Sequence, residues 1–142
     1  MSWATSAEQL LPDRSMETAR VFWEACARRE LWLPRCEGCG RFRWYLQEIC
    51  PHCWAAGAKW ERLSGRGTIF SFTVVHRAFH AALEAWVPFV SILVEPDEAP
   101  GVRLVSRLVD CPREAVRVGM PVEVSFTPIA EDVLLPFFRP IA

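Results

Sequence analysis

The chain has 142 residues, and 51% of them are hydrophobic, which is enough for one compact domain with a small appendage. Its formal net charge is −1, so it lacks the basic surplus that is typical of nucleic-acid-binding proteins. All its apolar runs are much shorter than the roughly 18 residues that a membrane-spanning helix requires, so we expect no membrane span.

The N-terminal part is predicted to be an arm followed by one helix. Residues 1–15 are weakly patterned, and we expect an arm that is mobile or ordered by a partner. From Ser15 or Thr18 to about Glu30, the side chains of one face recur at helical spacing. That face carries Phe22, Cys26 and Arg29, with Val21 and Ala25 beside them. The pattern predicts an amphipathic helix that docks on the rest of the chain.

Two cysteine pairs follow the predicted helix. Cys36 and Cys39 form the first pair, and Cys50 and Cys53 form the second after ten intervening residues. In such a pair the backbone turns tightly, so both sulfurs point to the same spot. Four thiolates held tetrahedrally fit Zn²⁺ and leave no open coordination position for water or substrate. The spacing therefore predicts a structural zinc site, not a catalytic one, with these four cysteines as its ligands.

Other uses of paired cysteines fit this sequence less well. No secretory signal precedes the pairs, which argues against disulfides, and no βαβ pattern surrounds them, which argues against a redox motif. Two symmetric pairs on a short hairpin favour zinc over an iron–sulfur cluster. His52, between two ligands, is expected to be an exposed turn residue. Because the thiols are expected to bind a metal and the sequence shows no signal peptide, we predict a cytoplasmic location.

The segment around the cysteines is predicted to be a zinc ribbon whose folding depends on the metal, because it is too small to fold alone. Arg41–Tyr45 alternates polar and aromatic residues, so we expect a half-buried strand there. Residues 54–65 are interpreted as a connector. The arginines make the ribbon locally basic, which we interpret as a solvated face, with a nucleotide phosphate or nucleic acid as the alternative. They are Arg35, Arg41 and Arg43.

Seven tryptophans are many for a chain of this length. They are Trp3, Trp23, Trp32, Trp44, Trp54, Trp60 and Trp86. A small chain cannot easily bury all of them, and tryptophan is enriched at protein interfaces. Two interpretations stay open, contact with a partner protein and packing between the metal module and the core.

Beyond Gly65 the sequence changes to strand-length apolar runs separated by turn residues. The runs cover residues 68–75, 87–95, 102–109, 122–126 and 133–138, with one helical turn at 112–115. In the first run, Thr68, Phe70, Phe72 and Val74 are expected to share one face. Five short strands of this kind fit a small OB-type barrel, which leaves no exposed sheet edge, and an open five-stranded sandwich is the alternative.

The remaining chemically interesting residues do not form a recognisable catalytic motif. His76 and His80 lie four residues apart, but no acidic residue with motif spacing accompanies them, so we do not expect a metal there. Cys26 and Cys111 stand alone and are expected to be packing residues. We find no nucleophile elbow, phosphate-binding glycine loop or carboxylate pair suited to acid–base catalysis. An independent enzyme that uses Cys111 or His76 is therefore a weaker hypothesis.

The order of motifs carries a family resemblance. It consists of Cys-x-x-Cys-Gly, Cys-Pro-x-Cys, the segment 64–77 (SGRGTIFSFTVVHR), and later landmarks at 104–106, 118–124 and 135–140. In these features the chain resembles the zinc-ribbon/OB-fold accessory family of acyl-CoA metabolism over about residues 17–140. The resemblance implies a mainly β fold in three parts. These are an arm and helix (residues 1–33), a rubredoxin-like zinc ribbon (34–57) and a five-stranded OB-fold barrel (58–142).

The resemblance also implies a non-catalytic subunit of a hetero-oligomer. Its partner would be a thiolase-like enzyme, either a thiolase or a retro-aldolase of steroid side-chain breakdown, and other family members are fused to acyl-CoA hydratases. The small subunit would stabilise the partner and help enclose its CoA-ester site. We hypothesise that Arg66, Arg77 and Phe79 contact this ester, because its phosphates need cations and its adenine needs a flat apolar surface. The rival function is an OB-fold protein that binds single-stranded nucleic acid.

Overall fold

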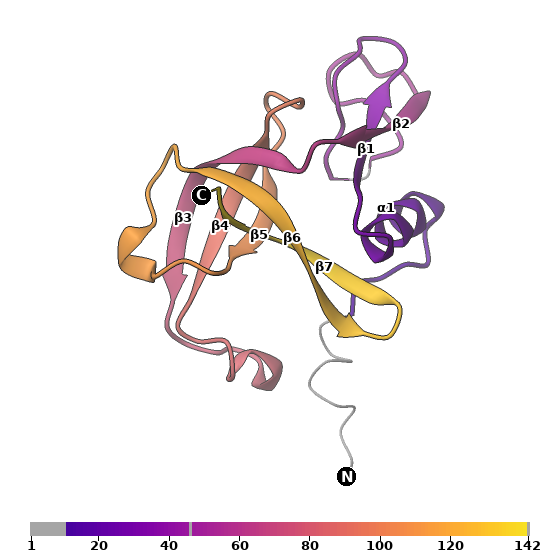
Figure 1. Cartoon of the computed structure of the whole chain (residues 1–142). Helices are drawn as coiled ribbons and strands as arrows, with labels where there is room; N and C mark the ends of the chain where they lie inside the picture. Colours follow the sequence, from indigo (N-terminus) through magenta and orange to yellow (C-terminus); the bar gives the residue numbers. More distant parts are fainter. Residues whose placement is uncertain (1–10, 46, 142) are drawn as a thin grey trace.

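A computed structural model describes residues 11–45 and 47–141. Within these ranges the chain is mainly β with one α-helix near its N-terminus, as the sequence predicts (Figure 1). The predicted arm falls largely on residues outside the described ranges, and so does Trp3. No helix in the described part of the chain is both long and apolar enough to cross a membrane.

Helix α1 spans Glu17–Ala27 and buries Phe22 and Cys26 of the predicted apolar face, both almost inaccessible to solvent. Arg29, which is also predicted for that face, lies beyond the helix and is exposed. The helix ends three residues earlier than expected because Arg29 adopts a left-handed conformation, with φ of 62°. The amide of Arg29 donates to the carbonyl of Cys26, and the amide of Glu30 donates to that of Ala25. These two hydrogen bonds form a Schellman motif, which stops the helix and turns the chain towards the first strand.

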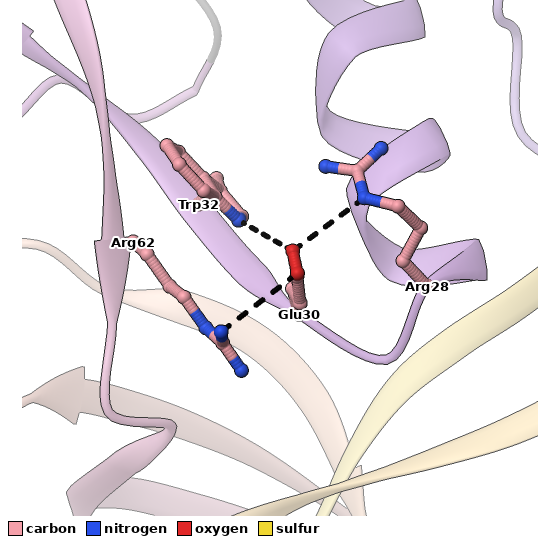
Figure 2. A network of polar contacts seen from close by, with 4 residues as sticks. All are labelled: Arg28, Glu30, Trp32 and Arg62. Carbon is pink, nitrogen blue, oxygen red and sulfur yellow. Dashed lines mark hydrogen bonds and ion pairs between the residues drawn. The ribbon is translucent and has the colours of Figure 1, made fainter.

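Just after this turn, the Glu30 carboxylate connects the helix end to the first two strands (Figure 2). It accepts from the indole Nε1 of Trp32 at 3.3 Å and from Nε of Arg28 at 3.5 Å. Nη1 of Arg62 lies 3.8 Å from the other carboxylate oxygen, Oε2 of Glu30. The Glu30 side chain is only 20% exposed, whereas both arginines are largely exposed, so its hydrogen bond to the half-buried Trp32 is the better protected of these contacts.

Strands β1 (Leu31–Cys36) and β2 (Ala58–Leu63) form an antiparallel pair that flanks the cysteine-containing loop. Two predictions are wrong here. Residues 54–65 are not only a connector, since they contain β2, whose three charged residues conceal the strand pattern. Arg41–Tyr45 is not a strand, because only the single bridge between Phe42 and Arg35 forms. The alternation of polar and aromatic residues fails there because the Arg43 side chain points into the protein.

Five further strands form a second sheet: β3 (Arg66–Val75), β4 (Phe89–Pro96), β5 (Leu104–Leu108), β6 (Pro121–Ala130) and β7 (Val133–Pro140). Their hydrogen-bonded order is β3-β4-β5-β7-β6, and β6 pairs back onto β3, so the sheet closes on itself. All neighbours are antiparallel except β5 and β7. The predicted helical turn is a short 3₁₀ helix over Arg113–Ala115, between β5 and β6.

A β-bulge changes the predicted faces of β3. Ile69 and Ser71 pair with consecutive residues of β4, so Phe70 is an extra residue on the bulged strand. Ile69 is therefore buried on the core side, whereas Phe70 is 51% exposed. Beyond the bulge, Phe72 and Val74 share one face, as predicted, and pack against the core. The expected single face with Thr68, Phe70, Phe72 and Val74 is correct only for its second half.

One continuous hydrophobic core joins the helix, the β1–β2 pair and the closed sheet. Phe22 and Cys26 enter it from α1, Leu33 and Leu63 from the strand pair, and Val94 from the sheet. Burial raises the pKa of the Cys26 thiol to about 12, which agrees with its expected packing role. Figure 1 accordingly shows α1 and the β1–β2 pair together on one side of the closed sheet.

Candidate metal centre

The four predicted ligands come together at one end of the β1–β2 pair. The Sγ atoms of Cys36, Cys39, Cys50 and Cys53 all lie within 4.8 Å of one another. Two of the Sγ–Sγ distances are 3.5 Å (Cys36–Cys53) and 3.7 Å (Cys39–Cys50). A tetrahedron with Zn–S bonds of about 2.3 Å places its sulfurs about 3.8 Å apart. The residues present therefore fit a closed four-sulfur zinc site.

The two cysteine turns have matching backbone geometry. In the first turn the Gly40 amide donates to the Cys36 carbonyl at 3.0 Å, and in the second the Trp54 amide donates to the Cys50 carbonyl at 3.0 Å. Amides also point at sulfurs, from Gly38 to Cys36 Sγ at 3.3 Å and from His52 to Cys50 Sγ at 3.4 Å. Such donors stabilise thiolate over thiol, which is the form that binds a metal.

The pKa of Cys36 is lowered to about 5, first by the backbone N–H of Cys39 and further by the Arg43 side chain and the Gly38 amide. A thiol with this pKa is ionised at neutral pH. The fold itself therefore supplies donors that favour the thiolate form of Cys36, which is the form that binds a metal.

Arg43 is the main structural residue of the loop, and sequence reasoning missed this role. It is 2% exposed, so the predicted solvated basic face is wrong at this position. Its guanidinium donates to the carbonyls of Glu48 and Ala55 at 2.9 Å each and of Gly57 at 2.8 Å. Its Nη2 also lies 3.6 Å from Cys36 Sγ. Arg43 thereby links the segments before and after the second cysteine pair to the first.

No sequence signal distinguishes Arg43 from its neighbours. Arg35 and Arg41 lie in the same basic segment, yet both side chains are exposed and make surface contacts. The acceptors of Arg43 are backbone carbonyls, which every residue type provides. Only the path of the loop shows that these carbonyls converge on one guanidinium.

Gly38 is required in the first turn because it lacks a side chain. A Cβ atom at this position would lie 2.9 Å from Cβ of Ala55 and 3.1 Å from Sγ of Cys53. Any larger residue would therefore push the first turn away from the second pair, and the sulfurs would separate.

The three histidines lie outside this centre. His52 Nδ1 contacts Nη1 of the exposed Arg41 at 2.9 Å, in agreement with the predicted turn position. His80 Nδ1 accepts the Ala82 amide at 3.1 Å and so caps the 3₁₀ helix Ala81–Leu83. His76 is exposed just after β3. Within residues 11–45 and 47–141, the four cysteines are the one group of three or more metal-binding side chains that converge.

The residues hypothesised to contact CoA are only partly brought together. Cζ of Arg77 lies 5.2 Å from the ring centroid of Phe79, and this ring is 84% exposed. Arg66 begins β3 whereas Arg77 lies two residues beyond its last residue, so the two arginines lie at opposite ends of the strand. At about 3.3 Å per residue, that strand separates them by roughly 30 Å.

Comparison with known proteins gives matches over nearly the whole chain. Residues 23–58 match the family model described as "ChsH2, rubredoxin-like zinc ribbon domain". Residues 60–127 match the one described as "ChsH2, C-terminal OB-fold domain".

Relatives and a solved structure extend these matches. A DUF35 domain-containing scaffold protein of Methanocaldococcus jannaschii is 38% identical over 69% of this chain and 68% of its own length. A probable enoyl-CoA hydratase alpha subunit of Thermomonospora curvata is 34% identical over 92% of this chain, which spans only 40% of that relative. A chain of the solved "Ltp2-ChsH2(DUF35) aldolase" superposes with a TM-score of 0.79 and 31% identity, over 91% of this chain and 98% of that one.

Proposed function

The chain belongs to the DUF35 family and carries both ChsH2-type domains, and we propose that it is a non-catalytic accessory subunit of an acyl-CoA enzyme. One observation carries this proposal most strongly. The chain superposes on 98% of a chain from an aldolase whose description names both Ltp2 and ChsH2(DUF35). The hydratase alpha subunit among the relatives supports the same class of substrate, although this chain spans only part of it.

The proposed role of zinc is structural. Four sulfurs converge, and two backbone turns with matching geometry carry them. Hydrogen bonds from the buried Arg43 stabilise the loop around them. When bound, zinc would join the two turns into one unit, and four thiolates leave it no position for a substrate. Cys36, Cys39, Cys50 and Cys53 would hold the ion.

An apolar cavity next to the metal centre supports docking of a partner protein. It measures about 820 Å³ and lies between the start of α1 and the cysteine loop. Its walls include Met16, Tyr45, Ile49 and Trp54, whose exposed fractions are 53, 60, 46 and 81%. Exposed apolar side chains gathered in one place mark interaction sites on soluble proteins. Trp54 therefore favours the partner interpretation of the tryptophan excess.

We propose a thiolase-like enzyme as the partner, with the catalytic residues on that enzyme. In this arrangement the small subunit stabilises its partner and helps enclose the CoA ester. Arg77 and Phe79 are the proposed contacts, since a cation beside an exposed ring suits a nucleotide phosphate and its base. Arg66 could reach only a different part of the ligand, because it lies at the other end of β3.

The division into residues 1–33, 34–57 and 58–142 stays a prediction, together with the five-stranded OB barrel. The boundary between the two matched family models near residue 59 supports the second division point. The pairing of β3 with β6 supports the barrel.

The test is co-purification from the native host, followed by assay. A tagged chain should retain a larger thiolase-like polypeptide, and the complex should cleave or form acyl-CoA esters. The isolated chain should have no such activity, whereas the isolated partner should have less activity or lower stability than the complex. A chain that purifies alone, or that turns over acyl-CoA by itself, would contradict the proposal.

A further inference from the structure

Arg107 of β5 lies in a cage of three aromatic side chains. Its Cζ atom is 4.6 Å from the ring centroid of Trp86, 5.8 Å from that of Phe89 and 5.7 Å from that of Phe137. Trp86 in turn meets Phe89 and Phe137 edge-on, at centroid distances of 5.9 and 5.5 Å. The rings come from the segment before β4, from β4 and from β7. The cage therefore holds the guanidinium in a defined position.

This guanidinium has rings around it but no anionic partner. Its Nε atom is buried without a hydrogen-bond partner. Within the described ranges, no carboxylate oxygen lies within 4.0 Å of it. Burial lowers the pKa of Arg107, yet an arginine stays protonated at neutral pH. Partial removal of a cation from water without a counter-charge is unfavourable, and the terminal nitrogens, which are not among the buried unpaired atoms, are the ones that an acceptor can reach.

Arg103, just before the same strand, provides an internal comparison. Its Cζ lies 3.8 Å from the ring centroid of Phe70, so it too stacks on an aromatic side chain. Arg103 also forms an ion pair with Glu95. The Arg103 guanidinium thus contacts both a ring and a carboxylate, whereas the Arg107 guanidinium contacts only rings.

A cavity of about 430 Å³ lies beside Arg107. Arg107, Phe89, Pro88, Val90 and Leu108 line one part of it, and residues 109–111 with Arg113 line the rest. The volume is within the range of sites for small ligands, roughly 300–1,000 Å³. Much of the exposed wall is polar, because Val90 and Leu108 are themselves buried in the core, and Pro88 and Phe89 supply its apolar part.

The charges around the cavity favour a ligand with one negative charge. Arg113 is paired with Glu114 at 3.2 Å, which leaves Arg107 as the uncompensated cation among the lining residues. Asp110 also lines the cavity and would repel a second negative charge. A planar carboxylate matches one guanidinium through two parallel hydrogen bonds.

We propose that this cavity binds the carboxylate of a small organic acid, with the terminal nitrogens of Arg107 as the paired donors and with Pro88 and Phe89 in contact with a short aliphatic part. The aromatic cage orients the donor and excludes water from one of its faces. This site is separate from the metal centre and does not rest on the proposed function of the chain.

The first experiment is a titration of the full zinc-loaded chain with sodium butyrate, with sodium chloride at equal ionic strength as the blank. The resonances of the Arg107 Nε–H and the Trp86 indole N–H report on the cage. We expect saturable shifts with butyrate and none with chloride. Shifts that grow linearly, or that chloride reproduces, would overturn the site and leave Arg107 as a packing residue.

Three variants make the test specific, with the Trp86 indole as the common readout. Arg107→Lys keeps the charge but loses the paired donors, so affinity for butyrate should fall about tenfold or more. Asp110→Asn removes the repulsion at an exposed position, so affinity should rise about twofold to threefold. Asparagine also tolerates the positive φ of 55° at this position, so the backbone should be kept. Arg117→Lys, an exposed arginine outside the cavity, should bind like the unaltered chain.

Two further results decide between explanations. The amide spectrum shows whether Arg107→Lys disrupts the fold. If it does, the Asp110→Asn variant still tests the site, because its affinity for butyrate should rise. An unchanged affinity of Asp110→Asn would count against the site. A parallel titration with sodium phosphate tests the charge argument. Phosphate should bind more weakly than butyrate, and tighter binding of phosphate would overturn the assignment to a carboxylate.

Discussion

The guanidinium of Arg43 lies 3.6 Å from the sulfur of Cys36 and is almost completely buried behind the metal centre. A buried cation next to a thiolate stabilises it, and the same side chain donates to five carbonyls of the surrounding loop, at 2.8 to 3.5 Å. The ligands and the loop that carries them are therefore parts of one hydrogen-bonded unit.

Replacement of Arg43 by methionine should lower the free energy of unfolding by at least about 3 kcal/mol, because several charge-assisted hydrogen bonds are lost and their carbonyls stay buried. Urea denaturation of the zinc-loaded chain measures this. Arg41→Met is the matched control, since Arg41 is exposed and contacts only His52, and its effect should stay within about 0.5 kcal/mol. Equal stabilities of the two variants would contradict the role of Arg43.

Gly38→Ala should destabilise the metal centre by about 2 kcal/mol, because the new Cβ would overlap Ala55 and crowd Cys53. Gly57→Ala is the control. A Cβ at that position meets the carboxylate end of Glu37, a flexible side chain that can move aside, so the cost should be below about 0.5 kcal/mol. Competition with a chelator compares the zinc affinities, and a weaker affinity for Gly57→Ala than for Gly38→Ala would contradict the packing argument.

The purified chain should contain one zinc ion, and Cys39→Ser should lose most of it whereas Cys111→Ser should keep it. Removal of the ion by a chelator should expose the amides of residues 36–57 to hydrogen exchange, since a small zinc module derives its folding energy from the metal. The amides of β3, β4 and β6 should stay protected, because their pairing does not involve the cysteines. Unchanged exchange in both regions would show that the metal is dispensable.

Trp54→Asn should weaken binding to the partner enzyme at least about tenfold, because exposed tryptophans in apolar surfaces dominate interface energies. Stability should change by less than about 0.5 kcal/mol, since the side chain is 81% exposed and asparagine accepts the positive φ at this position. Val118→Ser alters an apolar side chain that is 66% exposed and lies outside the cavity, and serves as the control. Calorimetry with the co-purified enzyme measures both, and equal losses would argue against this docking surface.

Arg77→Ala should reduce the affinity of the complex for CoA esters about tenfold, because a charge-assisted contact to phosphate is lost. Arg66→Ala should have a smaller effect, because from the other end of β3 this side chain reaches only a different part of the ligand. Titration of the complex with a CoA ester separates these outcomes. If Arg66→Ala has the larger effect, the contact surface lies at the start of β3 instead.

The sequence predicted the parts of this fold that depend on local geometry. The spacing of the four cysteines predicted that their sulfurs converge. This was possible because each cysteine turn is formed by a hydrogen bond between residues only four apart in the sequence. The apolar face of α1 was also predictable, since Phe22 and Cys26 recur at helical spacing.

Features that depend on distant partners could not be predicted in this way. The strand β2 carries Lys59, Glu61 and Arg62, and only its pairing with β1 makes it a strand. The bulge at Phe70 appears only when β3 is aligned with β4. The burial of Arg43 depends on carbonyls up to 14 residues away, and no residue type marks them.

The unbroken core that runs from α1 through the β1–β2 pair into the closed sheet also sets the mechanics of the whole molecule. Because the side chains of Leu33, Leu63 and Val94 pack within one interior, the β1–β2 pair that carries the cysteine loop cannot tilt against the sheet without opening that interior to water. A protein that grips the loop near Trp54 would therefore set the position of the far end of the sheet as well. The small chain would therefore bind its partner as one rigid body, with a fixed distance between the surface near Trp54 and the far end of the sheet.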